Sequence, residues 1–491
     1  MRQLAIAIVL FASTLGVAAT PIQLELEQRI KTVFELGYSP GMAVVVVRGD
    51  EVLIADGFGV ADMAIGRAVT PDTAFYIASS TKAFTAFAIT AMAERNEINL
   101  DAPLTDFIPQ VKLQEPLDPT RITLLRLLTH THGLYALGPI VFRTAYTGQW
   151  DQQTLVSLLD TYKQADYGES FRYTNLGYNI AGLMIQEKYK LDWRKLVERE
   201  IFKPLGMQNT TAFISKVAKT SLAMPHDINK DLTFQRIRMA KSDDTMHAAG
   251  GLVTTANDMA RWLIANLNGG VIDNTQIFPK DLVTNTQTQQ VEQDRNFLMH
   301  HRYGYTLGWD MATWEGKKLL TRFGGFEGFY SHMSLMPEEK FGVAVLVNGA
   351  TIGGPMAETV ATIIYQTLLD QGEEAIKSSY VSLDNIIQGQ KSGFIADLEK
   401  RLARPQTLQR PVNQYQGTFH NDQYGTMTWS ANGDKLVMRI GDVLIDPVEV
   451  FAAEKDQFRI DFGAGGMVAG FKFNGEKVER VDFLNVEFTP K

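Results

Sequence analysis

The 491-residue chain contains no cysteine. This absence excludes disulfide bonds, thiolate metal sites and lipid attachment through an N-terminal cysteine, so the folded protein depends on its hydrophobic core. The chain also lacks any block of like charges, and its formal net charge is −8. Because nucleic-acid binding normally requires a concentrated basic patch, this composition argues against it. After the N-terminal region, no apolar run is as long as the roughly 18 residues of a membrane helix, so no transmembrane segment is predicted in the mature chain.

Two motifs of common hydrolases are absent as well. The sequence contains neither an H-E-x-x-H zinc signature nor a G-x-S-x-G nucleophile elbow. His130 and His132 are two residues apart, but no third ligand motif accompanies them. The sequence therefore predicts no metal site and no cofactor.

The N-terminal residues 1–19 have the features of a secretory signal peptide. Arg2 provides a positive charge, residues 4–12 form an apolar run, and small residues lead up to Ala19, shortly before Pro21. This pattern predicts cleavage after Ala19 and export to the periplasm or the medium. An uncleaved membrane anchor is the alternative interpretation.

The length and the apolar patterning predict two folded units. Residues 43–47 and 52–60 have a hairpin pattern, and residues 328–336 and 341–348 have a second one, with helical segments between them. Strands at both ends with helices in the middle predict an α/β unit of the α+β kind over residues 22–370. Its terminal segments are expected to share one antiparallel sheet.

A second unit is predicted after a break in this pattern. Residues 371–411 are polar and charged, and they predict a linker with one helix near residues 383–402. Residues 412–491 consist of short alternating segments separated by turn signals. This part predicts about seven or eight strands in a small all-β, barrel-like or sandwich domain.

Ser79-Ser80-Thr81-Lys82 is an S-x-x-K motif that occurs once in the chain. Its ordinary interpretation is a serine N-cap followed by a lysine in the first helical turn. The residues that follow are apolar on nearly every side, so the helix is predicted to be buried. Burial lowers the pKa of a lysine and makes its neutral amine available as a proton acceptor, and a helix N-terminus stabilises a developing oxyanion.

Tyr173-Thr174-Asn175 is a Y-x-N motif. Taken alone, it is more typical of a packing tyrosine beside a turn asparagine. A phenol held next to a lysine ammonium would, however, take and return a proton, and the carboxamide of Asn175 would hold a substrate amide through its donor and its acceptor.

Arg322-Phe323-Gly324-Gly325 lies just ahead of the predicted strand at residues 328–336. The glycines permit close approach of the backbone to a substrate, as an oxyanion contact from a strand edge requires. A plain turn is the alternative interpretation.

In this order, the three motifs resemble those of the serine β-lactamase and penicillin-binding-protein superfamily, specifically its class C-like branch. Four further segments are similar to stretches typical of that branch: residues 123–134, 201–207, 249–259 and 303–309. The resemblance covers about residues 25–370. It implies a β-lactamase/transpeptidase-like catalytic domain, in which an antiparallel sheet is flanked by helices. Residues 412–491 resemble, less specifically, the lipocalin-like β-domain of some members.

The resemblance also implies a role for each site residue. Ser79 would be the acylated nucleophile, and Lys82 would help to deprotonate it. Tyr173 would pass protons between the nucleophile, the leaving group and the attacking water. Asn175 would bind the acyl-side amide, and the backbone N–H groups of Ser79 and Gly325 would form the oxyanion hole.

The third motif departs from the usual Lys-Thr-Gly or His-Ser-Gly. Arg322 keeps the basic charge and would still bind a carboxylate, but Phe323 replaces the hydroxyl residue before Gly324. This change argues against efficient β-lactam turnover or D-Ala-D-Ala carboxypeptidase activity. The expected substrate is a small molecule or peptide with an amide or ester bond, cleaved by a β-lactamase-like enzyme, a D-residue peptidase or an esterase. A non-catalytic penicillin-recognising protein is the alternative from another class.

Overall fold

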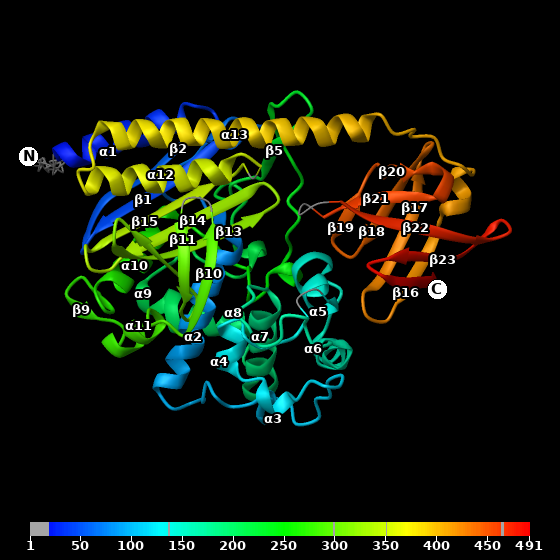
Figure 1. Cartoon of the computed structure of the whole chain (residues 1–491), viewed down its shortest axis with the longest axis horizontal. Helices are drawn as coiled ribbons and strands as arrows, with labels where there is room; N and C mark the ends of the chain where they lie inside the picture. Colours follow the sequence, from blue (N-terminus) through cyan, green and yellow to red (C-terminus); the bar gives the residue numbers. More distant parts are fainter. Residues whose placement is uncertain (1–18, 136–137, 298–299, 350, 463–465) are drawn as a thin grey trace, which may run out of the picture.

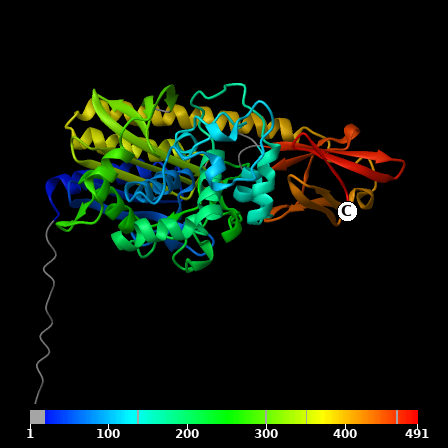
Figure 2. The same cartoon turned by 90° about the horizontal axis from the view of Figure 1, so that it is seen from below.

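The computed structural model describes residues 19–135, 138–297, 300–349, 351–462 and 466–491. The predicted signal peptide thus lies, up to residue 18, outside the described residues. Two units lie side by side, and a long helix runs from the first unit to the second (Figures 1 and 2). Within the described ranges, no helix is both long enough and apolar enough to cross a membrane.

A nine-stranded antiparallel sheet forms the centre of the first unit, in the order β10-β11-β12-β13-β14-β15-β1-β2-β3. Its strands are β1 (Gly41–Arg48), β2 (Glu51–Asp62), β3 (Arg67–Ala68), β10 (Val291–Phe297), β11 (His300–Tyr305), β12 (Asp310–Trp314), β13 (Lys317–Phe326), β14 (Phe329–Met336) and β15 (Phe341–Val347). β1 pairs with β15, with Val44 opposite Val345. The two ends of the unit therefore share one sheet, which confirms the prediction made from the two hairpin patterns.

Both faces of this sheet are covered, which explains the unbroken apolar run in β1. Val44 and Val46 face one core and Val45 and Val47 face the other, as the two-residue period of a strand requires. Helices α1 (Pro21–Phe34), α12 (Gly353–Leu368) and α13 (Glu373–Leu402) lie along one face (Figure 1). On the other face, α10 (Ala256–Leu267) packs against β1 and β15, and α2 (Thr81–Glu94) shares its core.

The remaining helices and strands of the first unit are short apart from α7. The helices are α3 (Leu104–Phe107), α4 (Leu124–Leu128), α5 (Pro139–Phe142), α6 (Gln152–Ser157), α7 (Leu176–Tyr189), α8 (Trp193–Val197), α9 (Lys203–Leu205) and α11 (Lys280–Thr286). The strands are β4 (Phe75–Tyr76), β5 (His226–Ile228), β6 (Phe234–Arg236), β7 (Val253–Thr254), β8 (Val271–Ile272) and β9 (Thr275–Gln276).

The second unit is one nine-stranded antiparallel sheet with β19 and β20 at its two ends, so it has more strands than predicted. Its strands are β16 (Gly417–Asn421), β17 (Gly425–Asn432), β18 (Lys435–Ile440), β19 (Val443–Ile445), β20 (Glu449–Ala452), β21 (Gln457–Asp461), β22 (Gly466–Asn474), β23 (Lys477–Phe483) and β24 (Val486–Pro490). The aromatic rings of Trp429, Phe458 and Phe471 pack together in its core. The helix predicted at 383–402 is the second part of α13, which begins at Glu373.

Candidate active site

Ser79 lies in a single 3₁₀ turn (Ala78–Ser80) directly before α2. The preceding residue, Ala78, has a left-handed backbone with φ of 43°. A non-glycine residue rarely adopts this conformation, and such strain concentrates at functional sites. The Ser331 hydroxyl fixes the turn, because it donates to the carbonyl of Ile77 at 2.8 Å and lies 2.8 Å from the Ser80 hydroxyl. The neighbouring Ser79 side chain is left partly exposed.

Lys82 lies in the first turn of α2 with its side chain fully buried. Its Nζ donates to Ser79 Oγ at 3.0 Å, to Asn175 Oδ1 at 2.7 Å and to the carbonyl of Ala249 at 2.9 Å. Burial, helped by the charge of Arg322 and opposed by the effect of Tyr173, lowers the pKa of this lysine to about 8. Near neutral pH the amine can therefore lose its proton while it is still aimed at Ser79.

Tyr173 lies between two cations. Its ring centroid is 4.8 Å from Lys82 Nζ and 4.9 Å from the guanidinium carbon of Arg322. Burial raises the pKa of the phenol, but the charges of Arg322 and Lys82 outweigh it, so the pKa lies below its ordinary value. The buried hydroxyl has no hydrogen-bond partner within the described part of the chain. It is therefore an ionisable group held ready for a proton transfer.

Two histidines hold the Y-x-N segment in place, a role that the sequence analysis did not find. His130 Nδ1 accepts the backbone N–H of Thr174 at 3.3 Å, and His132 Nε2 lies 3.3 Å from the Thr174 hydroxyl. Burial keeps the pKa of His130 well below its usual range and lowers that of His132 to about 4. Both rings are therefore neutral structural groups. Their spacing in H-T-H was the available signal, but it did not identify Thr174 as their partner.

The edge of β13 lies open beside Ser79. β12 pairs with β13 only as far as Thr321, whereas β14 pairs with it up to Phe326. A Cβ atom on Gly324 would lie 2.0 Å from the Ile77 carbonyl oxygen and 2.8 Å from the Ser79 nitrogen. Only glycine allows this close approach, and it brings the exposed Gly325 next to the nucleophile.

Arg322 occupies a different position from the one expected for a carboxylate receptor. Its side chain is fully buried, and its Nη1 lies 3.1 Å from Asp310 Oδ2. Arg302 also approaches this carboxylate, at 3.4 Å. The two guanidinium groups lower the pKa of Asp310 against the effect of burial, so the acid stays ionised. The charge of Arg322 lowers the pKa of both Tyr173 and Lys82, although the guanidinium itself does not reach solvent.

The structure thus brings together Ser79, Lys82, Tyr173 and Asn175, with the open edge of β13 beside them. Three further residues were predicted with them and lie nearby: Arg322, Gly324 and Gly325. The Asn175 carboxamide oxygen is engaged by Lys82, so only its NH₂ group is left for a substrate carbonyl. Asp310 was missed, because its contact with Arg322 depends on the pairing of β12 with β13.

A pH profile tests the proton-acceptor role of Lys82. We expect kcat/KM to rise about tenfold per pH unit up to a midpoint near the Lys82 pKa of about 8 and then to level off, because only the neutral amine accepts the Ser79 proton. Lys82 and Tyr173 interact, so the midpoint belongs to the pair. The measurement is kcat/KM between pH 5 and pH 10 on an ester substrate, corrected for spontaneous hydrolysis.

The Arg322→Gln variant sharpens this test. Removing the guanidinium eliminates a charge that disfavours protonation of both Lys82 and Tyr173, so we expect the midpoint to move to higher pH. A folded variant with an unmoved midpoint would contradict the electrostatic role of Arg322. A wild-type rate that keeps rising in proportion to hydroxide up to pH 10, toward the pKa of free lysine of about 10.4, would contradict the role of Lys82.

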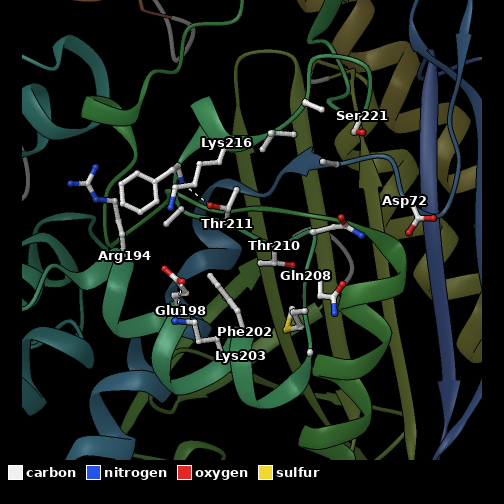
Figure 3. Close-up of a pocket in the computed structure, with 18 residues that line it drawn as sticks. Asp72, Arg194, Glu198, Phe202, Lys203, Gln208, Thr210, Thr211, Lys216 and Ser221 are labelled. Carbon is white, nitrogen blue, oxygen red and sulfur yellow. Dashed lines mark hydrogen bonds and ion pairs between the residues drawn. The ribbon is translucent and has the colours of Figure 1, made fainter.

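A cavity of about 590 Å³ is lined by a different set of residues (Figure 3). Ser79, Lys82 and Tyr173 are not among its lining residues. Two of its charged groups are already engaged, since Lys203 pairs with Glu198 at 3.3 Å and Arg194 pairs with Asp192 at 2.5 Å. The volume of this cavity would make it a candidate active site. The ionisable groups with shifted pKa values at Ser79 make that cluster the better candidate.

Comparison with known proteins places these features in a family. The family model described as Beta-lactamase matches residues 26–364. Protein flp of Staphylococcus aureus (strain MW2) is 26% identical over 333 residues, which are 66% of this chain and 63% of that protein. Unguisins hydrolase ungD of Aspergillus violaceofuscus is 25% identical over 360 residues, which are 67% of this chain and 62% of that protein. The chain therefore spans less than two thirds of the length of these relatives.

The fold has solved counterparts over nearly its whole length. The octameric penicillin-binding protein homologue from Pyrococcus abyssi superposes with a TM-score of 0.61 at 22% sequence identity. The match covers 94% of this chain and 99% of the other. It includes the C-terminal β-unit as well as the first unit, and it shows that the β-lactamase/transpeptidase-like fold was predicted correctly.

Proposed function

Because the chain belongs to the Beta-lactamase family, we propose that it is a serine hydrolase that cleaves a neutral ester or amide through an acyl-enzyme on Ser79. The observation that carries the proposal is the hydrogen bond from the buried Lys82 Nζ to Ser79 Oγ at 3.0 Å. A lysine with a pKa of about 8 can be neutral at working pH and can remove the serine proton during attack. The name of the relative ungD, a hydrolase, is in line with this chemistry.

In the proposed mechanism, Ser79 Oγ attacks the substrate carbonyl as its proton passes to Lys82. The backbone N–H groups of Ser79 and Gly325 stabilise the oxyanion, and the Asn175 amide donates to a substrate carbonyl. Lys82 passes this proton to Tyr173, which gives it to the leaving group, and the leaving group departs as an alcohol or an amine. Water then attacks the acyl-enzyme, losing its proton to the same pair of residues, and Ser79 is regenerated with release of the acid.

The burial of Arg322 supports the choice of a neutral substrate. A receptor for a substrate carboxylate needs a cation that the ligand can reach, but this guanidinium is fully buried and paired with Asp310. The neighbouring Phe323 is half-buried, and its ring stacks on Phe297 with centroids 4.1 Å apart. Aromatic rings therefore cover this end of the site, with Arg302 packed against Phe297, and such a surface suits an uncharged leaving group.

Acid-quenched intact mass spectrometry tests the proposal. We expect the wild-type protein mixed with p-nitrophenyl acetate to carry one acetyl group at short times and to release p-nitrophenol continuously. With benzylpenicillin, whose carboxylate cannot reach the buried Arg322, we expect little or no adduct. A stoichiometric penicillin adduct without turnover of any ester would instead favour a penicillin-recognising protein.

A further inference from the structure

The C-terminal β-unit lies close to the open edge of β13. β19 is an edge strand of its sheet and lies on the side that faces the first unit (Figure 1). A cavity of about 130 Å³ is lined by all three residues of β19 and by Phe326, the last residue of β13. Phe326 is two residues beyond Gly324, or roughly 7 Å along an extended strand. Ser79, Lys82 and Tyr173 do not line this cavity either, but Phe326 connects it to the strand edge beside Ser79.

The walls of this cavity are mainly apolar, and both units contribute to them. The first unit contributes Tyr146 and Phe326, and the second contributes Leu444, Ile445 and Phe462. Three charged residues, Arg238, Glu327 and Asp461, also line the cavity beside these apolar groups. The Tyr146 ring centroid is 6.1 Å from that of Phe326 and 6.1 Å from that of Phe462. An engineered apolar cavity of about 150 Å³ binds benzene, so this space suits a single ring or a short aliphatic chain.

Directional hydrogen bonds keep the two units in register around the cavity. The buried Arg143 donates from Nε to the Gln423 carbonyl at 2.6 Å and from Nη2 to the Asp422 carbonyl at 2.7 Å. Directly before β19, the Asp442 backbone N–H donates to the Thr147 carbonyl at 2.9 Å. These bonds fix β19 relative to β13, so the cavity is a preformed part of the site.

The orientation of the substrate follows from the position of Tyr173. Its ring lies over the guanidinium of Arg322, and its hydroxyl would protonate the leaving group. The leaving group then lies toward Arg322, at one end of the open segment of β13. The acyl group must point the other way along the strand, past Gly325 toward Phe326. The cavity lies at that end.

We propose that the cavity between β13 and β19 is the acyl-chain subsite, and that the C-terminal β-unit selects substrates with an apolar acyl group of about four to six carbons or one aromatic ring. This inference rests on the function proposed above and names the class of substrate. It also gives the β-unit a direct part in specificity. Without the β-unit, the acyl chain would lie in water.

A chain-length series of esters with one leaving group tests the subsite. With p-nitrophenyl acetate, butyrate, hexanoate and decanoate, we expect kcat/KM of the wild type to rise about fourfold for each buried CH₂ group and then to fall once the cavity is full. In Leu444→Trp, which fills the cavity, the ratio of butyrate to acetate kcat/KM should drop from about 16-fold, for two CH₂ groups, to near one. In Leu444→Ala the maximum should move to a longer chain.

Opposite shifts in the two Leu444 variants cannot arise from loss of folded protein. The matched control is Leu402→Trp, the same replacement at a leucine that is 69% exposed at the end of α13, and it should keep the wild-type ratio. A flat series with normal acetate turnover, or unchanged ratios in both Leu444 variants, would overturn the subsite alone. Failure of the wild type to hydrolyse any ester would overturn the proposed function as well.

Discussion

The Ser79→Ala variant is expected to lose at least about 10⁴-fold in kcat/KM on every ester or amide that the wild type cleaves. Without Oγ no acyl-enzyme forms, and Lys82 has no hydroxyl to deprotonate. Residual activity should reflect only the oxyanion donors and substrate binding. The measurement is initial rate on p-nitrophenyl butyrate at pH 8, together with acid-quenched intact mass, which should show no acyl group on the variant.

Ser80→Ala is the matched control for this experiment. Ser80 is the next residue along the chain, but its hydroxyl lies 2.8 Å from Ser331 and is buried away from the substrate side. We expect a loss of about 1 kcal/mol in the free energy of unfolding and a rate within about tenfold of wild type. Equal losses of kcat/KM in the two variants would mean that the loss comes from a disturbed fold of the turn and not from removal of a nucleophile. Full activity in Ser79→Ala would contradict the proposed acyl-enzyme on Ser79.

Local patterns were sufficient to predict most of the first unit and the placement of Lys82 beside Ser79. The buried strand at 43–47 and the helix after Ser79 are continuous apolar runs, so their period and propensity are read directly from neighbouring residues. The S-x-x-K spacing places Lys82 one helical turn from Ser79, and a 3.0 Å contact follows from that geometry. These features depend on contacts within a few residues.

The features that could not be predicted from the sequence depend on contacts between segments far apart in the chain. The contact of Arg322 with Asp310 requires β12 to pair with β13 in one register, with Asp310 opposite Thr321. The docking of the β-unit depends on surfaces far apart in the chain, such as Arg143 and the loop at 422–423. Propensity and spacing do not encode such partners. We therefore propose that Arg322, which is buried, acts as a charge on Tyr173 and not as a substrate contact.

The Lys82→Met variant is expected to lose about 10³-fold in kcat/KM, the second-largest effect. Methionine keeps the length and apolar stem of the lysine but removes the amine. The Ser79 hydroxyl then has no proton acceptor, and Asn175 Oδ1 and the Ala249 carbonyl lose their donor. Because the titrating group is gone, the limb of the pH profile near 8 should disappear or move toward the pKa of Tyr173. The measurement is kcat/KM against pH for wild type and variant.

Lys241→Met separates catalysis from the general effect of deleting a buried ammonium. Lys241 is also buried, burial lowers its pKa to about 7, and its Nζ donates to the Ala145 carbonyl at 2.6 Å. Because the pKa of Lys241 is lowered in the folded state, the free energy of unfolding of the wild type should increase between pH 7 and about pH 10.4, the pKa of an unfolded lysine. This increase should be absent in the variant.

Acetate ester hydrolysis by Lys241→Met should stay within about tenfold of wild type, and the limb of the pH profile near 8 should be retained. If Lys241→Met lost as much activity as Lys82→Met, buried charge in general, and not the contact with Ser79, would explain both losses.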